Sequence, residues 1–227
     1  MHKLKFILPN QEIIEFNVEK ALCIGYSGRN QEMVKKHIEE LSREGIAPPP
    51  TVPMIYPVSD ILVTQNETID VLGEKTSGEV EFVLLKSKNT TYLTVGSDHT
   101  DRELEGYSIP YAKQATPKPV AKYAWAVDEL VEHWDDIMLT CEINIEGQWE
   151  TYQEGQVSSV MHISDILTLT EKRGNLNENG NVLFGGTVPI LGGSFKYGDK
   201  YRLTMHDPVT NRKITHEYAV RDISVKE

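Results

Sequence analysis

Three acidic residues stand where two apolar strands are expected to meet. Glu79 and Glu81 lie two positions apart at the start of an apolar run, FVLL. Residues at that spacing project from the same face of a strand. Asp98 follows after a turn expected at 86–89 and a return strand expected at 90–95. A hairpin made of these two strands would place Asp98 beside the two glutamates.

Carboxylates that share one small region repel each other and raise each other's pKa unless a cation or several donors lie between them. Oxygen ligands carried by rigid strands suit hard divalent cations. We therefore predict that Glu79, Glu81 and Asp98 bind one divalent metal, Mg²⁺ or Mn²⁺, with Ca²⁺ as an alternative. The competing interpretation is the solvated face of an edge strand, where alternating glutamates are common. The apolar run favours the metal site, because acids that lead into a buried strand need partners.

Composition excludes several classes of partner. The 227 residues include 23 Lys and Arg against 34 Asp and Glu, a net charge of −11. This charge argues against binding to nucleic acid or to an anionic membrane. The N-terminal segment is neither a signal peptide nor a spanning helix, so we expect a cytoplasmic protein. Cys23 and Cys141 lie in apolar surroundings without a CxxC spacing, which predicts two reduced core thiols rather than a zinc site.

The sequence predicts many short strands and few helices. A hairpin is expected at 3–18 and a strand at 22–26, followed by a helix over 31–43 that Asn30 caps and that buries Met33, Ile38 and Leu41. Later we expect extended chain at 48–57, an irregular loop at 107–120, short helices at 126–134 and, capped by Ser164, at 164–172, and strands around and after them. The pattern predicts a β-dominated α+β fold. We expect residues 1–50 to form an N-terminal element that could act as a lid, packed with a β domain at 51–227.

Several stretches together resemble the fumarylacetoacetate hydrolase superfamily, and in particular an uncharacterised bacterial branch of it. Its members carry two glutamates spaced ExE, as at Glu79 and Glu81, and an Asn-Asp-x-Ser-x-Arg segment, which reads Ser97 to Arg102 here with Ser in place of Asn. A lysine-bearing loop follows, which Lys113 matches better than Lys118. Further matches are a Gly-x-x-Ser-x-Met segment at 155–161, with Ser158 or Ser159 as its serine, a Thr-Gly-Thr-Pro turn at 185–189 with an inserted valine, and a Gly-Asp turn at 198–199.

The resemblance implies a mixed β-roll, usually a homodimer, in which a divalent metal chelates the carboxylate and keto oxygens of a small 2-oxo acid. Glu79, Glu81 and Asp98 match the metal ligands of the family. Lys113 would lie near a developing oxyanion. The substrate would be bound by Arg102, Ser159, Gly186 and Thr187. Arg102 has a second interpretation, which we favour: it pairs with an aspartate and holds the ligand loop.

The hydrolytic members of the family activate water with a histidine and a glutamate spaced i and i+3 on an N-terminal helix. His37 and Glu40 match that spacing, and residues three apart share a helix face, so the glutamate could orient the imidazole as a general base. The alternative is a pair of solvated residues on a charged face.

Three alternative functions are consistent with these sequence features. The first is hydrolytic C–C cleavage of an acylpyruvate-like 2,4-dioxo acid. The second is a metal-dependent lyase or isomerase (decarboxylase, dehydratase or tautomerase) acting on a related 2-oxo acid. The third is a non-catalytic, metal-stabilised β protein.

Overall fold

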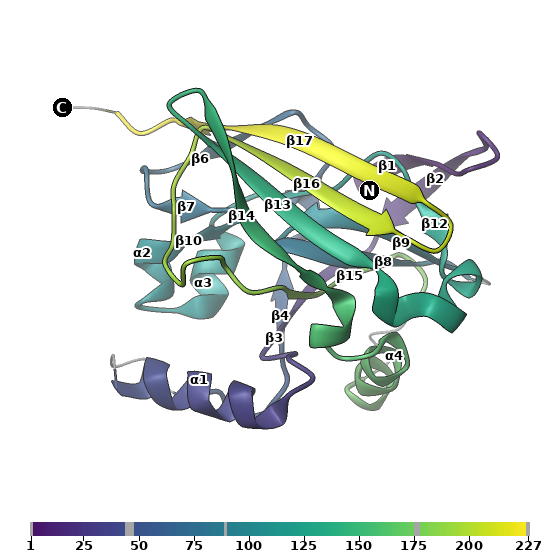
Figure 1. Ribbon diagram of the computed structural model, residues 1–227, viewed down its shortest axis with the longest axis horizontal. Helices are drawn as coiled ribbons and strands as arrows, with labels where there is room; N and C mark the ends of the chain where they lie inside the picture. Colours follow the sequence, from purple (N-terminus) through teal and green to yellow (C-terminus); the bar gives the residue numbers. More distant parts are fainter. Residues whose placement is uncertain (1, 44–47, 89, 175–177, 226–227) are drawn as a thin grey trace.

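A computed structural model of the protein describes residues 2–43, 48–88, 90–174 and 178–225, without the side chains of residues 37, 40 and 41. Two large sheets pack face to face, and helices and small strands surround them (Figure 1). One sheet has the order β12-β9-β8-β15-β3-β4 and the other β14-β13-β16-β17-β6. Their strands are β3 (Lys20–Gly25), β4 (Met54–Val58), β6 (Thr68–Val71), β8 (Val80–Lys86), β9 (Thr91–Ser97), β12 (Trp125–Ala126), β13 (Met138–Ile145), β14 (Gln148–Gln156), β15 (Asn181–Thr187), β16 (Lys200–Asp207) and β17 (Arg212–Asp222).

The six-stranded sheet is mixed, because β15 runs parallel to β3 and antiparallel to β8. Strand β8 is buried on both faces. Val80, Phe82 and Leu84 pack into the core between the two large sheets, whereas Val83 and Leu85 face a second core. The predicted β-dominated fold is thus confirmed, and the apolar run after Glu81 is a central strand, as its sequence indicates.

The second core lies between the six-stranded sheet and the N-terminal hairpin. This hairpin pairs β1 (His2–Ile7) with β2 (Ile13–Val18), as predicted. Its residues Phe6 and Phe16 meet edge to face and pack with Val83 and Phe184 of the sheet. Two further pairs of short strands lie outside the large sheets. They are β5 (Val63–Thr64) with β11 (Lys118–Pro119), and β7 (Thr76–Ser77) with β10 (Thr100–Asp101).

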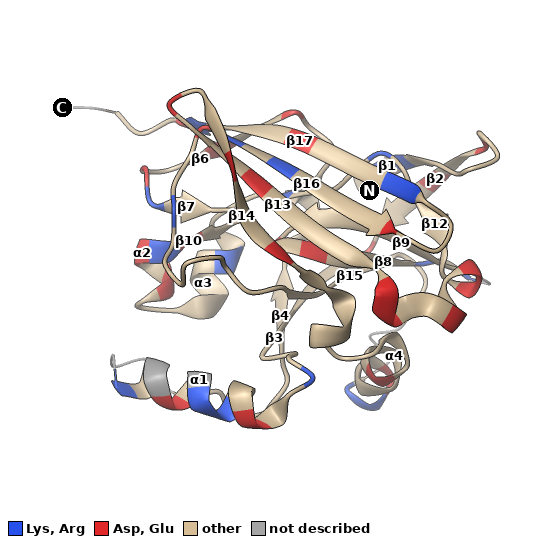
Figure 2. Ribbon diagram, in the orientation of Figure 1, with Lys and Arg blue, Asp and Glu red and all other residues tan. Residues whose placement is uncertain are grey.

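The outer face of the five-stranded sheet is polar. Arg202 on β16 lies 3.1 Å from both Glu142 on β13 and Glu217 on β17, so opposite charges alternate across three neighbouring strands. Figure 2 shows this alternation, and it also shows acidic and basic residues interspersed along α1 (Gln31–Arg43). The charged side chains therefore make this face of the sheet suited to contact with water.

Helix α1 begins and ends where the sequence predicts. The Asn30 side chain accepts hydrogen bonds from the backbone N–H groups of Glu32 and Met33, both at 3.1 Å, which confirms the predicted cap. The expected apolar stripe is wrong at Met33, which is 63% exposed, whereas Val34 is buried. The reason is that α1 lies beside the body of the molecule rather than flat against a sheet (Figure 1). The side chain of Leu41 lies outside the described part.

Other local predictions need correction. The segment expected to be an irregular loop contains α3 (Ile109–Gln114), because Pro110 stands in the first turn, where a missing N–H is tolerated. The helix expected near 126–134 is a pair of 3-10 helices, and His162 rather than Ser164 caps the later helix, which spans Ile163–Lys172. The remaining helices are α2 (Arg102–Glu105), α4 (Ile163–Lys172) and the 3-10 helices η1 (Asp60–Leu62), η2 (Val127–Glu129), η3 (Val131–Asp136) and η4 (Val157–Ser159).

The predicted extended chain at 48–57 ends in β4, which carries Pro57 and lies at the edge of its sheet, where a proline removes no needed hydrogen bond. Cys23 and Cys141 are buried free thiols, as predicted. None of the helices in the described ranges has the length and apolarity needed to cross a membrane.

The imidazole of His216 provides a test of folding against pH. It is buried against Tyr218, and burial lowers its pKa to about 4. The unfolded chain, with an ordinary pKa near 6.5, therefore binds more protons than the folded chain between about pH 4 and 6.5, so stability is lost as the pH falls through that window. We expect wild type to lose about 2.5 kcal/mol more than His216→Phe between pH 7 and 4.5, measured by urea unfolding. Thr215→Val, at the exposed neighbouring position, should keep the wild-type slope; equal slopes for wild type and His216→Phe would contradict the prediction.

Candidate metal centre

The hairpin of β8 and β9 brings the three predicted acids together. Glu81 pairs with Gly96, and the backbone N–H of Asp98 donates to the carbonyl of Glu79 at 3.0 Å. This register sets Asp98 opposite Glu79, so all three side chains leave the same face of the sheet. One carboxylate oxygen from each residue lies within 4.8 Å of the other two. The predicted proximity is therefore confirmed.

Two lysines flank the innermost acid. Lys113 Nζ lies 2.5 Å from Asp98 Oδ2 and 3.6 Å from Glu79 Oε2. Lys118 Nζ lies 3.2 Å from Asp98 Oδ1 and donates to the carbonyl of His99 at 2.6 Å. Lys113 borders the cavity described below, whereas Lys118 is fully buried behind Asp98. The sequence left open which lysine faces the site, and this geometry favours Lys113.

Arg102 links the acids to the α2 helix. Its Nη2 lies 3.0 Å from Glu79 Oε1, its Nη1 donates to Glu105 at 2.9 Å, and its Nε donates to Ser77 Oγ at 2.7 Å. The ring of Phe195 covers the guanidinium at 4.3 Å. The side chain is buried and its partners lie within the protein. This arrangement matches the structural interpretation of Arg102 better than the substrate-binding one, although its partners include Glu79 rather than an aspartate.

The surroundings shift the pKa values of Glu81 and Asp98 in opposite directions. Burial raises the pKa of Glu81 well above its usual range, and the charges of Asp98 and Glu79 add to that effect. Burial also acts against ionised Asp98, but Lys113 and Lys118 outweigh it and lower the pKa of Asp98 to about 2. In the same way, Asp98 and Glu79 outweigh burial at Lys113 and raise its pKa. The charged form is thus disfavoured at Glu81 and favoured at Asp98.

Glu81 is held by the segment after β15. The N–H of Gly186 donates to Glu81 Oε2 at 2.8 Å. Gly186 has a φ of 119°, and a Cβ at this position would lie 1.9 Å from Ser27 Oγ, so only glycine fits between Ser27 and Glu81. The next residue, Thr187, donates its hydroxyl to the carbonyl of Val80 at 2.9 Å. This contact fixes the loop beside the acids.

Gln153 is a buried residue that the sequence did not single out. Its Nε2 donates to Thr187 Oγ1 at 2.8 Å and to the carbonyl of Val188 at 2.7 Å, and its Oε1 accepts from the N–H of Val80 at 2.9 Å. It therefore ties β14 to both the acid-bearing strand and the 186–188 segment. A polar residue inside an alternating strand gives no signal of such a role. The sequence also did not single out Glu105 at the end of α2, Tyr56 on β4 or Ser27 in the loop after β3, because their place at the cavity depends on tertiary packing.

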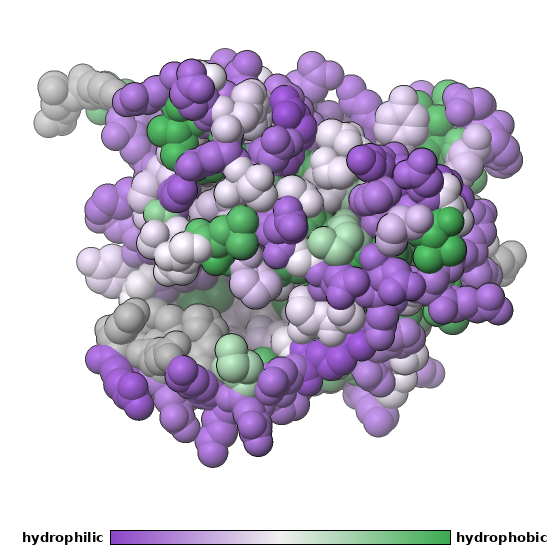
Figure 3. All heavy atoms as spheres, viewed as in Figure 1, coloured by the Kyte–Doolittle hydropathy of each residue, from purple (hydrophilic) through white to green (hydrophobic). Residues whose placement is uncertain are grey.

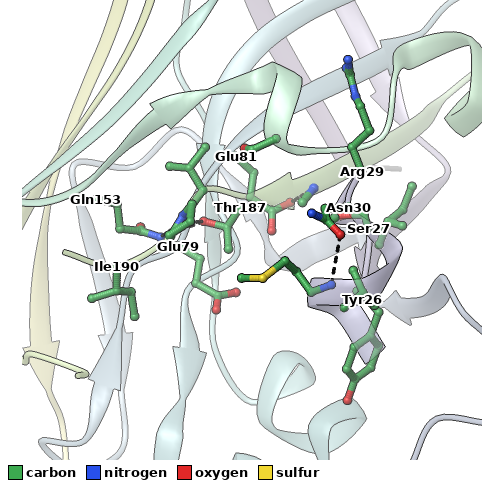
Figure 4. Close-up of a pocket in the computed structure, with 18 of the residues that line it drawn as sticks. Tyr26, Ser27, Arg29, Asn30, Glu79, Glu81, Gln153, Thr187 and Ile190 are labelled. Carbon is green, nitrogen blue, oxygen red and sulfur yellow. Dashed lines mark hydrogen bonds between the residues drawn. The ribbon is translucent and has the colours of Figure 1, made fainter. Parts of the chain in front are cut away.

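A cavity of about 980 Å³ opens in front of Glu79 and Glu81. It lies between the body of the protein and α1, where Figure 3 shows the surface hollowed. Figure 4 shows the carboxylates of Glu79 and Glu81 beside Thr187, Gln153 and Ile190 on one side, with Ser27 and Asn30 across from them. The acids therefore form part of the wall of a space large enough for a small-molecule ligand.

The structure places most of the other predicted site residues around this cavity. Gly186, Thr187 and Ser159 line it, and the Ser159 hydroxyl donates to the carbonyl of Gln156. The side chains of His37 and Glu40 lie outside the described part of the structure. His99 is buried, with its ring nitrogens near Tyr218 Oη and Thr76 Oγ1.

The three acids suit a hard divalent cation. They offer only oxygen ligands, and the cavity gives room for water or a ligand to complete the shell. Asp98 Oδ1 is buried and, despite the nearby Lys118, accepts no well-aligned hydrogen bond. A cation beside Glu81 would also balance the charge whose burial raises the pKa of that residue. The residues present therefore fit a divalent metal.

Comparison with known proteins places the chain in a family. Residues 24–218 match the family described as "Protein of unknown function (DUF2848)". The chain belongs to this family. No curated protein sequence gives a significant match.

The DUF2848 chain shares its fold with enzymes of known structure. A protein from Burkholderia cenocepacia assigned as a fumarylpyruvate hydrolase matches with a TM-score of 0.65 and 16% identity over 98% of this chain and 93% of that one. A 2-keto-3-deoxy-D-arabinonate dehydratase complexed with magnesium and 2,5-dioxopentanoate matches with a TM-score of 0.58 and 16% identity over 92% and 77%. A Mycobacterium abscessus protein assigned as a 2-hydroxyhepta-2,4-diene-1,7-dioate isomerase matches with a TM-score of 0.60 and 13% identity over 94% and 81%. The fold is that of the fumarylacetoacetate hydrolase superfamily, as the sequence resemblance implied.

Proposed function

We propose that this protein is a divalent-metal-dependent enzyme that cleaves a C–C bond of an acylpyruvate-like 2,4-dioxo acid by hydrolysis. The observation that carries the proposal is the cluster of Glu79, Glu81 and Asp98, whose oxygens lie within 4.8 Å of one another at the wall of the cavity. Mg²⁺ or Mn²⁺ suits these ligands best. The magnesium complex of a dehydratase with the same fold supports a cation of this kind.

The proposed reaction breaks the bond between C3 and C4 of the dioxo acid. Water adds to the C4 carbonyl, the electron pair of the C3–C4 bond passes to the 2-oxo acid half as an enolate, and a proton at C3 completes pyruvate beside a carboxylic acid. A divalent cation bound by the three acids would polarise the keto oxygen and stabilise the enolate charge.

The chain's own groups are assigned within that reaction. Lys113, protonated beside Asp98, is placed to donate to an oxyanion in the cavity. Thr187 and Gly186 border the position proposed for the substrate carboxylate, and Ser159 lies on the same wall. Because the N–H of Gly186 and the hydroxyl of Thr187 already bind protein groups, we expect Thr187 to accept new partners only by reorienting its hydroxyl.

Water activation is assigned to His37 and Glu40. This assignment rests on their helical spacing and on the place of α1, whose residues Met33 and Val34 line the cavity. The same helix would form the lid within the N-terminal element of residues 1–50. Residues 20–25 of that element, strand β3, also form an inner strand of the six-stranded sheet, so we propose one packed unit whose mobile part is α1. We also propose that the protein is a homodimer in the cytoplasm.

A lyase or isomerase acting on a related 2-oxo acid is the second candidate. The observation that favours it is the presence of a dehydratase and an assigned isomerase among proteins of the same fold. Such a reaction would use the same acids and Lys113 without activated water.

A panel of 2-oxo and 2,4-dioxo acids, assayed with Mg²⁺ or Mn²⁺ by loss of absorbance and by product analysis, tests both candidates. The proposal expects metal-dependent release of pyruvate and a carboxylic acid. His37→Ala should lower turnover at least about 100-fold without changing metal affinity, whereas Lys35→Ala, an exposed control on the same helix, should leave turnover unchanged. Undiminished turnover in His37→Ala would remove the hydrolase and leave the lyase or isomerase. Failure to bind any divalent ion at saturating concentration would remove both.

A further inference from the structure

The cavity is larger than the space beside the acids, and much of its described lining is apolar. Its described lining includes Met33 and Val34 from α1, Tyr56 from β4, Ile109 from α3, and Ile190 and Phe195 from the segment after β15. Met33 is 63% exposed and Phe195 is 45% exposed. Large apolar side chains that border a cavity and remain open to solvent mark a surface that an apolar group can cover.

The cationic residues of the described lining already have partners within the protein. Arg29 forms two hydrogen bonds of 2.7 Å to Asp135, and in Figure 4 its side chain points away from Glu79 and Glu81. Lys113 is bonded to Asp98, and Lys36 is engaged within the protein. Glu105 adds a further negative charge to the wall. A second carboxylate on the ligand would therefore lose its hydration without gaining a dedicated cationic partner.

We propose that the substrate of this protein carries an uncharged, apolar group at the end opposite its 2-oxo acid, rather than a second carboxylate. The inference rests on the proposed function, because it assumes that the three acids and their cation bind the 2-oxo acid end. It distinguishes this chain from the hydrolases of the same fold that are named for fumarylpyruvate and maleylpyruvate, whose acyl ends are acidic. The apolar group would lie against Met33, Ile190 and Phe195.

The binding of oxalate and of unreactive 2-oxo acids tests the two ends of the cavity separately. Oxalate and 2-oxobutanoate report on the metal end alone. Lengthening 2-oxobutanoate to 2-oxohexanoate should tighten binding about fourfold for each methylene that the apolar wall covers. The matched dicarboxylate, 2-oxoadipate, has the same chain length as 2-oxohexanoate and should bind at least about tenfold more weakly. Titration calorimetry of the full chain with saturating Mg²⁺ measures all four ligands.

Two neighbouring positions provide the variant and its control. Ile190 lines the cavity and lies beside Gln153 and Glu79 in Figure 4, whereas Leu191 is exposed and is not part of the described lining. Ile190→Lys would introduce a cation at the apolar wall, and it should tighten 2-oxoadipate at least about tenfold relative to wild type while weakening 2-oxohexanoate. Leu191→Lys adds the same charge outside the cavity and should change neither affinity more than about twofold.

The outcomes distinguish failure of the inference from failure of the proposed function. If oxalate and 2-oxobutanoate bind with Mg²⁺ but chain length has no effect, or 2-oxoadipate binds better than 2-oxohexanoate to wild type, the apolar assignment is overturned and the proposed function survives. If none of the four ligands binds in the presence of Mg²⁺, the proposed function falls and the inference falls with it.

Discussion

Replacing Glu81 by Gln is expected to lower the affinity for Mg²⁺ or Mn²⁺ at least about 100-fold, more than loss of a group that merely orients a ligand would. The substitution keeps the shape of the side chain and leaves an oxygen to accept the hydrogen bond from Gly186. It removes the negative charge, and Glu81 is 3% exposed, so little solvent screens the missing charge. Because burial disfavours the charged form of Glu81 and raises its pKa, a cation bound beside it would stabilise that charged form.

Thermal and urea unfolding with and without Mg²⁺ provide a readout that does not depend on activity. At a metal concentration about 100 times the dissociation constant, wild type should gain about 2.7 kcal/mol of stability. Glu81→Gln should gain almost none at the same concentration. Glu105→Gln is the matched control, because Glu105 lines the same cavity but lies outside the cluster of three acids. Equal stabilisation of wild type and Glu81→Gln by Mg²⁺ would show that Glu81 is not a ligand.

The acids could be found from sequence because strand geometry makes their positions periodic. The ExE spacing fixes a common face for Glu79 and Glu81, and the apolar run after them fixes a buried strand. Only the register between β8 and β9 had to be assumed for Asp98. The pairing of Glu81 with Gly96 supplies that register, and the three oxygens meet as expected.

The surroundings of the acids could not be predicted in the same way, because they depend on tertiary contacts. Lys113 and Lys118 lie five residues apart and both reach Asp98, yet only Lys113 faces the cavity, a difference set by the packing of α3 and β11. Gln153 gives no periodic signal, because its three hydrogen bonds join segments far apart in sequence. Met33 matches an apolar stripe, but α1 has no sheet against it, so helical periodicity alone mispredicted its burial.

Removal of the Arg102 side chain is expected to destabilise the fold more than any other single change at the site. Arg102→Met would leave Glu79 and Glu105 without their shared cation, and it would leave Ser77 without its donor. The guanidinium side chain is 3% exposed, and loss of one partner of such a buried pair costs about 3–5 kcal/mol. Urea unfolding in metal-free buffer should show this loss directly.

Two companion variants test whether Arg102 acts through structure or through substrate. Arg102→Lys should recover less than half of the loss, because one ammonium group cannot reach Glu79, Glu105 and Ser77 with the geometry of the planar guanidinium. Adding Glu105→Gln to Arg102→Met should recover part of the stability by removing one of the two acids that have lost their arginine, which a cycle of the four proteins would measure. If Arg102→Met unfolded at the wild-type urea concentration and only raised KM, Arg102 would instead be a substrate ligand. The three contacts within the protein favour the first result, because a guanidinium held by Glu79, Glu105 and Ser77 has little freedom to turn toward a ligand.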